Sequence, residues 1–331
     1  LILGQVLTSG LGMNTARQVA LNSGMQQSSF AYVVNQVCGS GMRATMDGSS
    51  KIYSGESELL IVGGQESMSR ARHTYLSRTG EKKLGNNVFI DTLVNDGLTD
   101  AFSKEHMGIT AENVSRRYTV TRQDQDQFAY QSYLKTYKAI KNNYFKNELI
   151  KSPYKDEVRK DTTLVKLGQL KAVFKKSGTV TAGNASSLND GASFLALASE
   201  NYINSNKIKP IAKILSWASS AGNPDYMGVT PITAIQKLMK KMGVNIGYFD
   251  LVEINEAFAA TSVAVQRSLK IDPNKLNIAG GAIALGHPIG CSGARIVTTL
   301  AHQLRRTKQK IGVASMCIGG GQGLAIAIEK I

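Results

Sequence analysis

The feature of this sequence that most constrains its fold is a pair of segments that occurs twice in the same order. Residues 38–44 (CGSGMRA) resemble residues 290–296 (GCSGARI), and residues 60–65 (LIVGGQ) resemble residues 315–322 (SMCIGGGQ). From the Ser-Gly pair to the Gly-Gly pair is 23 residues in the first copy and 27 in the second. Two matches in the same order at similar spacing predict a duplicated half.

Apolar, strand-like runs alternate with helix-like segments in both copies. Residues 30–34 and 59–62 are short apolar runs, and residues 194–198 have the pattern of a buried strand. Strand-like and helical segments alternate again from about residue 211. This alternation predicts an α/β layered fold. Residues 70–187 are more polar and predict an inserted domain.

Composition limits the class of protein. Three cysteines, an odd number, do not make a disulfide framework and fit a reducing compartment. The sequence contains no apolar run long enough to predict a membrane span. The net charge is +15, and much of the excess lies in residues 135–176, which could meet a polyanionic ligand or form a solvated lysine-rich face. No nucleic-acid motif accompanies this stretch, so nucleic acid is not an expected partner.

Two cysteines lie where thiol chemistry is favoured. Cys38 lies between a predicted strand and a predicted helix, whose positive end lowers the pKa of a nearby thiol, and only the thiolate attacks carbon well. The flanking glycines would let a bulky substrate approach the backbone. A buried structural cysteine in a tight turn is the alternative. Cys317 lies at a strand end before three glycines.

Two polar residues have a similar context. Asn255 directly follows a predicted strand, and His287 stands between a glycine and a proline, where a histidine has little packing value. A metal site formed by Cys38, Cys291, Cys317 and His287 is disfavoured because no Cys-x-x-Cys or His-x-x-His pairing supports it. The glycine runs lack the lysine and the spacing of nucleotide-binding loops.

These residues carry a resemblance to a known family. Residues 35–44, 255–258 (NEAF), 286–290 (GHPIG) and 317–321 (CIGGG) resemble, in order and spacing, the four signature regions of the thiolases. The similarity runs over essentially the whole chain. It implies a five-layer αβαβα fold made of two similar halves with an inserted loop domain that holds coenzyme A. The implied boundaries are 1–70 with 188–210 for the N-terminal half, 71–187 for the loop domain and 211–331 for the C-terminal half.

The resemblance also implies roles for the site residues. Cys38 would be the nucleophile that carries an acyl group, and Cys317 would exchange the proton of the α-carbon. His287 would activate Cys38 and donate toward a thioester oxygen, while Asn255 would fix a water beside it. A second oxyanion hole would use the backbone amides of Cys38 and Gly319. No metal or redox cofactor is implied, because coenzyme A is a substrate and product.

The resemblance is strongest to the biosynthetic type of thiolase, which condenses two acetyl-CoA to acetoacetyl-CoA and CoA and runs the reverse thiolysis. Residues 106–108 (HMG) and 181–186 (TAGNAS) resemble the short-chain pocket of that type. His106 has an alternative interpretation as an ordinary helix-start residue, and Cys291 is interpreted as a packing residue. The residues implied for CoA and its acyl group are Leu98, His106, Met107, Arg159, Phe174, Ala182, Ser186, Leu188, Ala257 and Phe258.

Three other functions remain open at this point. The first is a degradative 3-ketoacyl-CoA thiolase of broader chain length, and the second is a thiolase-like protein that binds acyl-CoA or lipid without turnover. The third is a Cys-His hydrolase, in which Cys317 would have no role. We expect a homo-oligomer, a dimer or a tetramer. We expect a cytoplasmic location, with the mitochondrial matrix as the alternative.

The N-terminus departs from the family pattern. The resemblance implies about fifty further residues before the point that matches Leu1, including a core strand and helix of the first half. We expect their absence to reflect an incomplete sequence or a truncation. Without them the first sheet is expected to lack a central strand and to leave apolar surface bare.

Overall fold

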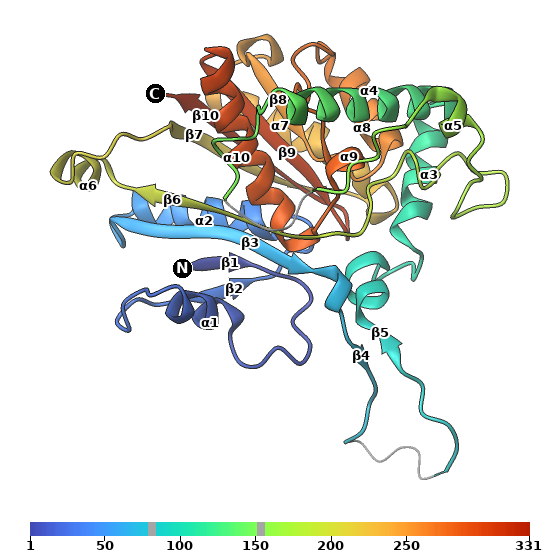
Figure 1. Cartoon of the computed structure of the whole chain (residues 1–331), viewed down its shortest axis with the longest axis horizontal. Coiled ribbons are helices and arrows are strands. Elements are labelled where there is room, and N and C mark those ends of the chain that lie inside the picture. The colour runs from blue at the N-terminus through green and yellow to red at the C-terminus, as the bar shows by residue number, and fades with distance from the viewer. Residues whose placement is uncertain (79–83, 151–155) are drawn as a thin grey trace.

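The computed structural model describes residues 1–78, 84–150 and 156–331. Two β-sheets and three helical layers form a five-layer αβαβα arrangement, as expected (Figure 1). Helix α1 covers the outer face of the first sheet, α2 and α10 lie between the sheets, and α7 and α8 cover the outer face of the second. The bounds are α1 Thr15–Asn22, α2 Ser40–Tyr53, α10 Ile289–Thr307, α7 Thr230–Met242 and α8 Ala259–Leu269.

The two sheets share a three-strand arrangement, β1-β3-β6 in the first and β8-β9-β10 in the second, with a parallel pair followed by an antiparallel pair. The first has the order β2-β1-β3-β6 and the second the order β8-β9-β10-β7. In each sheet a helix leads to a strand (β3 or β9) that pairs antiparallel with the next strand in the sheet (β6 or β10). The duplication predicted from the sequence therefore exists. The bounds are β1 Ile2–Gly4, β2 Tyr32–Val34, β3 Leu59–Ser67, β6 Asp190–Ala198, β7 Ala212–Ala221, β8 Leu251–Ile254, β9 Ile311–Ile318 and β10 Gln322–Lys330.

Alternating side chains along the strands fill the two sides of each sheet. On β9, Met316 and Ile318 pack toward α2 and α10, whereas Val313 packs toward α7. On β1, Ile2 packs toward α2 and Leu3 toward α1. Both sheets are thus buried on the faces that meet the central helices, and burial of these faces is the main source of stability.

The repeated Ser-Gly pairs allow α2 and α10 to touch backbone to backbone. A Cβ at Gly41 would lie 2.8 Å from Ala294 N, and a Cβ at Gly293 would lie 2.4 Å from Met42 N. A Cβ at Gly39 would lie 2.4 Å from a carbon of Ile318. The expectation that glycines 39 and 41 make room for a substrate is therefore wrong, because protein fills these spaces.

Residues 68–189 are inserted between the neighbouring strands β3 and β6. They begin with a hairpin, β4 and β5, that projects from the body of the molecule (Figure 1), and continue with α3, α4 and α5. Helix α4 starts with a capping box: Thr121 Oγ1 accepts from Asp124 N at 3.1 Å, and Asp124 Oδ2 accepts from Thr121 N at 2.9 Å. The exact division into domains stays a prediction. The bounds are η1 Met68–Arg70, β4 His73–Thr74, β5 Ile90–Asp91, η2 Leu93–Leu98, α3 Met107–Arg117, α4 Arg122–Lys141 and α5 Leu164–Gly168.

Short elements complete the described chain: α6 Glu200–Ser205, η3 Pro224–Val229, η4 Ile246–Tyr248 and α9 Ala282–Leu285. Within residues 1–78, 84–150 and 156–331, no helix combines the length and the apolar character that crossing a membrane requires.

Two expectations about the first sheet are wrong. The sheet has no central gap, because β1 pairs directly with both β2 and β3, for example Ile2 with Val62. Strand β6 is not fully buried: it lies at the edge of the described sheet, its residues alternate between exposed and half-buried, and Phe194 is 37% exposed. The expected bare apolar surface is therefore found at an edge strand.

Candidate active site

Three loops and the end of one strand bring the candidate chemical groups to the seam between the two halves. Cys38 lies between β2 and α2, Asn255 follows β8, His287 precedes α10, and Cys317 lies near the end of β9. Strands β8 and β9 are parallel, so their carboxyl ends meet at one edge, and Asn255 N donates to Ser315 O at 3.0 Å.

The Cys38 loop lies against the end of β9. Gln36 Nε2 donates to Gln322 Oε1 at 2.7 Å, and the Gly39 backbone touches Ile318. The Gly319 N–H points to the Cys38 thiol, and the charge of Cys38 acts on Cys317. The structure thus brings together the two cysteines and the glycine that the resemblance selected, from positions about 280 residues apart.

The electrostatics of Cys38 differ from the sequence prediction. Burial raises the pKa of the Cys38 thiol to about 11, although the N–H groups of Gly319 and of Cys38 itself act in the opposite direction. The prediction of a lowered pKa is therefore wrong, because loss of hydration outweighs the helix end and the amides. Cys38 is a thiol at neutral pH, so it needs a base to remove its proton.

His287 is placed as a neutral base. Ser292 Oγ donates to Pro288 O at 2.9 Å and therefore presents a lone pair to His287 Nδ1, 2.6 Å away. Nδ1 thus carries the ring proton. Nε2 carries no proton, and its lone pair faces Asn255 Nδ2, which is 3.3 Å away. Burial lowers the pKa of His287 to about 4, and the charge of Arg295 acts in the same direction. The ring is therefore neutral at physiological pH.

Asn255 is almost completely buried beside this ring. Its Oδ1 has no hydrogen-bond partner in residues 1–78, 84–150 and 156–331. An unpaired buried acceptor is rare and costly, and such atoms recur where a water or a substrate binds.

Cys317 lies deeper than Cys38. It is 2% exposed, and burial raises the pKa of its thiol to about 12, with a further increase from Cys38. The turn that follows has Gly320 and Gly321 at φ of +83° and +82°, a region that only glycine enters without strain. This turn exposes the Gly319 N–H, which lies next to the Cys38 thiol.

An apolar cluster lines the approach to Cys317. Met107, Phe174, Ala257 and Phe258 pack with it, and Leu98 packs with Cys38 in a neighbouring cluster. Residues predicted for the acyl pocket from the inserted segment and from the C-terminal half therefore pack together, and their role as a pocket stays a prediction.

Three rings in and beside this cluster are fixed by their contacts with one another. The His106 ring stacks on Phe174 with centroids 4.6 Å apart, and Phe174 meets Phe258 edge to face at 6.3 Å. His106 Nδ1 also accepts from Gly108 N at 3.0 Å and so caps α3. Both interpretations of His106, as a helix-start residue and as a pocket residue, therefore agree with its contacts.

The remaining predicted CoA residues are placed less uniformly. The N–H and Oγ of Ser186 both donate to Ala257 O at 3.0 Å, which joins this segment to the pocket. Ala182 and Leu188 lie exposed on the same segment. Arg159 is exposed, and its described hydrogen bond, from Thr162 Oγ1 to its own carbonyl, does not connect it to the pocket.

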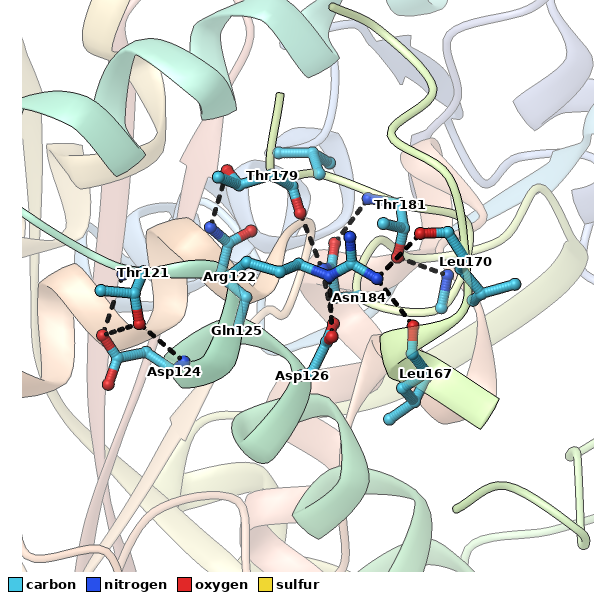
Figure 2. Close-up of polar contacts among 12 residues, drawn as sticks. Thr121, Arg122, Asp124, Gln125, Asp126, Leu167, Leu170, Thr179, Thr181 and Asn184 are labelled. Carbon is cyan, nitrogen blue, oxygen red and sulfur yellow. Dashed lines mark hydrogen bonds and ion pairs between the residues drawn. The ribbon is translucent and has the colours of Figure 1, made fainter. Parts of the chain in front are cut away.

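A polar network in the loop domain holds residues 179–186 in place (Figure 2). Arg122 Nε donates to Asp126 Oδ2 at 2.7 Å, and Asn184 Nδ2 donates to the other Asp126 oxygen at 2.9 Å. Thr181 N donates to Asn184 Oδ1 at 2.8 Å, and Gln125 Nε2 donates to Thr179 Oγ1 at 2.9 Å. Helix α4 thereby positions the predicted CoA segment.

Sequence reasoning did not assign functions to Ser292, Asp126 or Asn184. Asn184 lies inside the recognised TAGNAS segment, but its partner Asp126 is 58 residues earlier, so no local pattern shows the contact. No three His, Cys, Asp or Glu side chains that could hold a metal lie together in the described parts of the chain. Cys291 is buried, and burial raises the pKa of its thiol to about 12, in agreement with a packing role.

Comparisons with known proteins agree with this geometry. Residues 1–201 match the thiolase N-terminal domain, and residues 208–330 match the thiolase C-terminal domain. The chain therefore belongs to the thiolase family, as the four signature regions predicted.

Individual relatives extend the match to the full chain. An acetyl-CoA acetyltransferase of Shinella zoogloeoides is 46% identical over 341 aligned positions, which cover 100% of this chain and 87% of the relative. The crystal structure of the Bacillus anthracis acetyl-CoA acetyltransferase superposes with a TM-score of 0.96 at 39% identity and covers 100% and 86% of the two chains. The crystal structure of human mitochondrial 3-ketoacyl-CoA thiolase in complex with CoA superposes with a TM-score of 0.96 at 40% identity and covers 100% and 86% of the two chains.

Proposed function

We propose that this chain is an acetyl-CoA C-acetyltransferase, which transfers an acetyl group through Cys38 to a second acetyl-CoA and forms acetoacetyl-CoA and CoA. The observation that carries the proposal is the coupled pair of thiols, Cys38 and Cys317, with the neutral base His287 held against Asn255 at the end of the neighbouring strand. Acyl transfer needs one nucleophile, and carbon–carbon bond formation needs in addition a group that removes an α-proton. Relatives at 46% and 39% identity carry the same activity in their names.

The first half-reaction forms an acetyl-cysteine. As Cys38 Sγ attacks the thioester carbon, its proton moves to His287 Nε2, the ring nitrogen that carries no proton. The protonated Nε2 then donates toward a thioester oxygen, beside a water held by Asn255 Oδ1. The C–S bond to CoA breaks, and Cys317 gives its proton to the departing CoA sulfur, which leaves Cys317 as a thiolate.

The second half-reaction forms the carbon–carbon bond. The Cys317 thiolate removes an α-proton from a second acetyl-CoA, and the enolate attacks the carbonyl of acetyl-Cys38. The amides of Cys38 and Gly319 stabilise the oxyanion. The bond to Cys38 then breaks, and Cys38 recovers the proton that His287 holds. Both thiols and the imidazole return to their initial protonation states, so the enzyme gains and loses no proton over the full reaction.

The CoA residues and the oligomer are part of the same proposal. The basic stretch around Arg159 supplies positive charge for the CoA phosphates. The β4–β5 hairpin exposes apolar side chains, including Tyr75 and Phe89, whose rings meet at 4.9 Å. An exposed apolar hairpin favours association with a further copy of the chain. The cytoplasmic location stays a prediction, with the mitochondrial matrix as the alternative.

A broader-chain 3-ketoacyl-CoA thiolase is the second candidate, because the human enzyme superposes equally well. Met107 argues for the short chain: it is buried, and its sulfur lies 3.4 Å from the position of a Cβ on Gly319, close to both cysteines. A side chain at this place leaves limited room for a longer acyl group.

The experiment compares CoA-dependent cleavage of 3-ketoacyl-CoA thioesters of four, six and ten carbons, together with acetoacetyl-CoA formation from acetyl-CoA. We expect kcat/KM for the four-carbon substrate to exceed that for the ten-carbon substrate by about tenfold or more. Met107→Ala should reduce the ratio of kcat/KM between the four-carbon and the ten-carbon substrate. Equal rates would favour the broader enzyme, and folded protein that turns over none of the substrates would contradict the proposal.

A further inference from the structure

The carboxylate of Glu66 joins the two halves beside the candidate site. Glu66 lies near the end of β3 and is 3% exposed. It accepts three backbone N–H groups: Val6 N at 3.0 Å, Leu7 N at 3.1 Å and Gly290 N at 3.0 Å. The first two belong to the segment after β1, and the third belongs to the first turn of α10.

The bond to Gly290 serves as a helix cap from a distant part of the chain. The first turn of a helix leaves its N–H groups without partners inside the helix. Pro288, at the N-cap of α10, provides no side-chain cap, and the Gly290 N–H is satisfied by Glu66, 224 residues away. A carboxylate at this position is also favoured by the positive end of the helix dipole.

The surroundings leave little freedom at this contact. A Cβ at Gly64 would lie 2.0 Å from Gly290 O, and a Cβ at Gly290 would lie 2.7 Å from Glu66 Oε2. Strand β3, which runs to Ser67, and the start of α10 therefore meet through closely packed backbone at these two glycines.

The groups held by Glu66 belong to both reacting loops. The first turn of α10 carries Ser292, which fixes the His287 ring, and His287 itself lies three residues before Gly290. Val6, Leu7 and Ile289 pack around Cys38 in one apolar cluster. One carboxylate thus connects the backbone behind the base to the backbone behind the nucleophile.

We propose that Glu66 is a positioning residue for acyl transfer, whose ionised carboxylate holds the first turn of α10, and with it His287, against the Cys38 loop. This inference rests on the proposed function. Glu66 need not touch a substrate, and its effect is transmitted through the orientation of His287.

The position of Glu66 has an electrostatic cost that makes the inference testable. The charge of Glu66 raises the pKa of the Cys38 thiol and that of Cys291. A further titratable group coupled to Cys38 is Cys317 on β9. Removing the negative charge should therefore make Cys38 more acidic while acyl transfer becomes slower. A merely structural side chain would not produce these opposite changes.

The test compares Glu66→Gln, Glu66→Asp and the wild type, with Glu148→Gln as a matched control. Glu148 is a half-buried carboxylate that accepts from Thr299 Oγ1 and is not among the groups that act on Cys38. Two rates are measured at Cys38 by peptide mass spectrometry: alkylation by iodoacetamide at pH 8, and acetylation by acetyl-CoA. Folding of each variant is checked by thermal unfolding.

For Glu66→Gln we expect alkylation about 3- to 10-fold faster and acetylation at least about 10-fold slower. Glu66→Asp keeps the negative charge, so the alkylation rate should match that of the wild type. Its shorter side chain cannot reach all three backbone N–H groups, so the acetylation rate should fall. Glu148→Gln should change neither rate.

Acetylation at the wild-type rate in folded Glu66→Gln, or alkylation that is not faster, would overturn the inference. If Glu66→Gln does not fold, Glu66→Asp decides: slower acetylation with unchanged alkylation supports the inference, and unchanged acetylation overturns it. A wild-type protein that is alkylated but never acetylated would instead refute the proposed function. This outcome differs from those that support or overturn the role of Glu66, because it concerns the wild type alone.

Discussion

Replacing Cys317 by alanine is expected to abolish acetoacetyl-CoA formation while Cys38 still becomes acetylated. Cys317 lies too deep to compete as the nucleophile, and its thiol is the group that we assign to the α-proton. Removing a positioned acid–base group typically costs about 10²- to 10⁴-fold in rate. Condensation should fall by this amount or more, because no second thiol is available.

The acetylation of Cys38 should be slowed less. Water can protonate the departing CoA sulfur in place of Cys317, so the acetyl-enzyme still forms and then accumulates. The measurement combines peptide mass spectrometry of Cys38 with chromatographic detection of acetoacetyl-CoA. Cys291→Ala is the matched control, since Cys291 is equally buried and has no assigned role, and it should retain both steps. Loss of acetylation together with condensation would indicate that Cys317 acts in the first step instead.

Replacing His287 by alanine should slow the acetylation of Cys38 by about 10³-fold or more, because His287 both removes the thiol proton and then donates to the thioester oxygen. Burial raises the pKa of Cys38 to about 11, so the thiolate is scarce at pH 7 without the base. His302→Ala, a change farther along α10, is the control and should alter the rate by no more than about twofold.

The pH dependence gives an independent test of His287. Burial lowers the pKa of His287 to about 4, so the ring stays neutral and able to accept a proton as the pH falls from 8 to about 5. In the wild type, the rate of acetylation should therefore show no half-loss near pH 6.5, the ordinary value for histidine. A half-loss at that pH would contradict the neutral, buried ring that the structure shows.

Local patterns predicted the layered fold because the buried faces repeat at short range. The apolar run at residues 30–34 contains β2, and the runs at 59–62 and 194–198 lie within β3 and β6. The candidate site residues were identified from four motifs that occur in a fixed order, and composition alone could not have identified them. Their convergence at one seam is a property of the folded chain.

The errors share a physical cause. Glycines 39 and 41 meet protein rather than substrate, because their neighbours come from the other half of the chain. The pKa of Cys38 is raised because burial depends on surrounding segments that the sequence around Cys38 does not reveal. Glu66 carried no signal for the same reason, since its partners are about 60 and 224 residues away.

The most direct test of the central claim is peptide mass spectrometry of the protein after brief exposure to acetyl-CoA alone. The account predicts one acetyl group on Cys38, none on Cys291, and its removal when free CoA is added. Cys38→Ala should show no such group. A folded protein in which Cys38 stays unmodified, or in which another residue carries a CoA-dischargeable acetyl group, would contradict acyl transfer through Cys38.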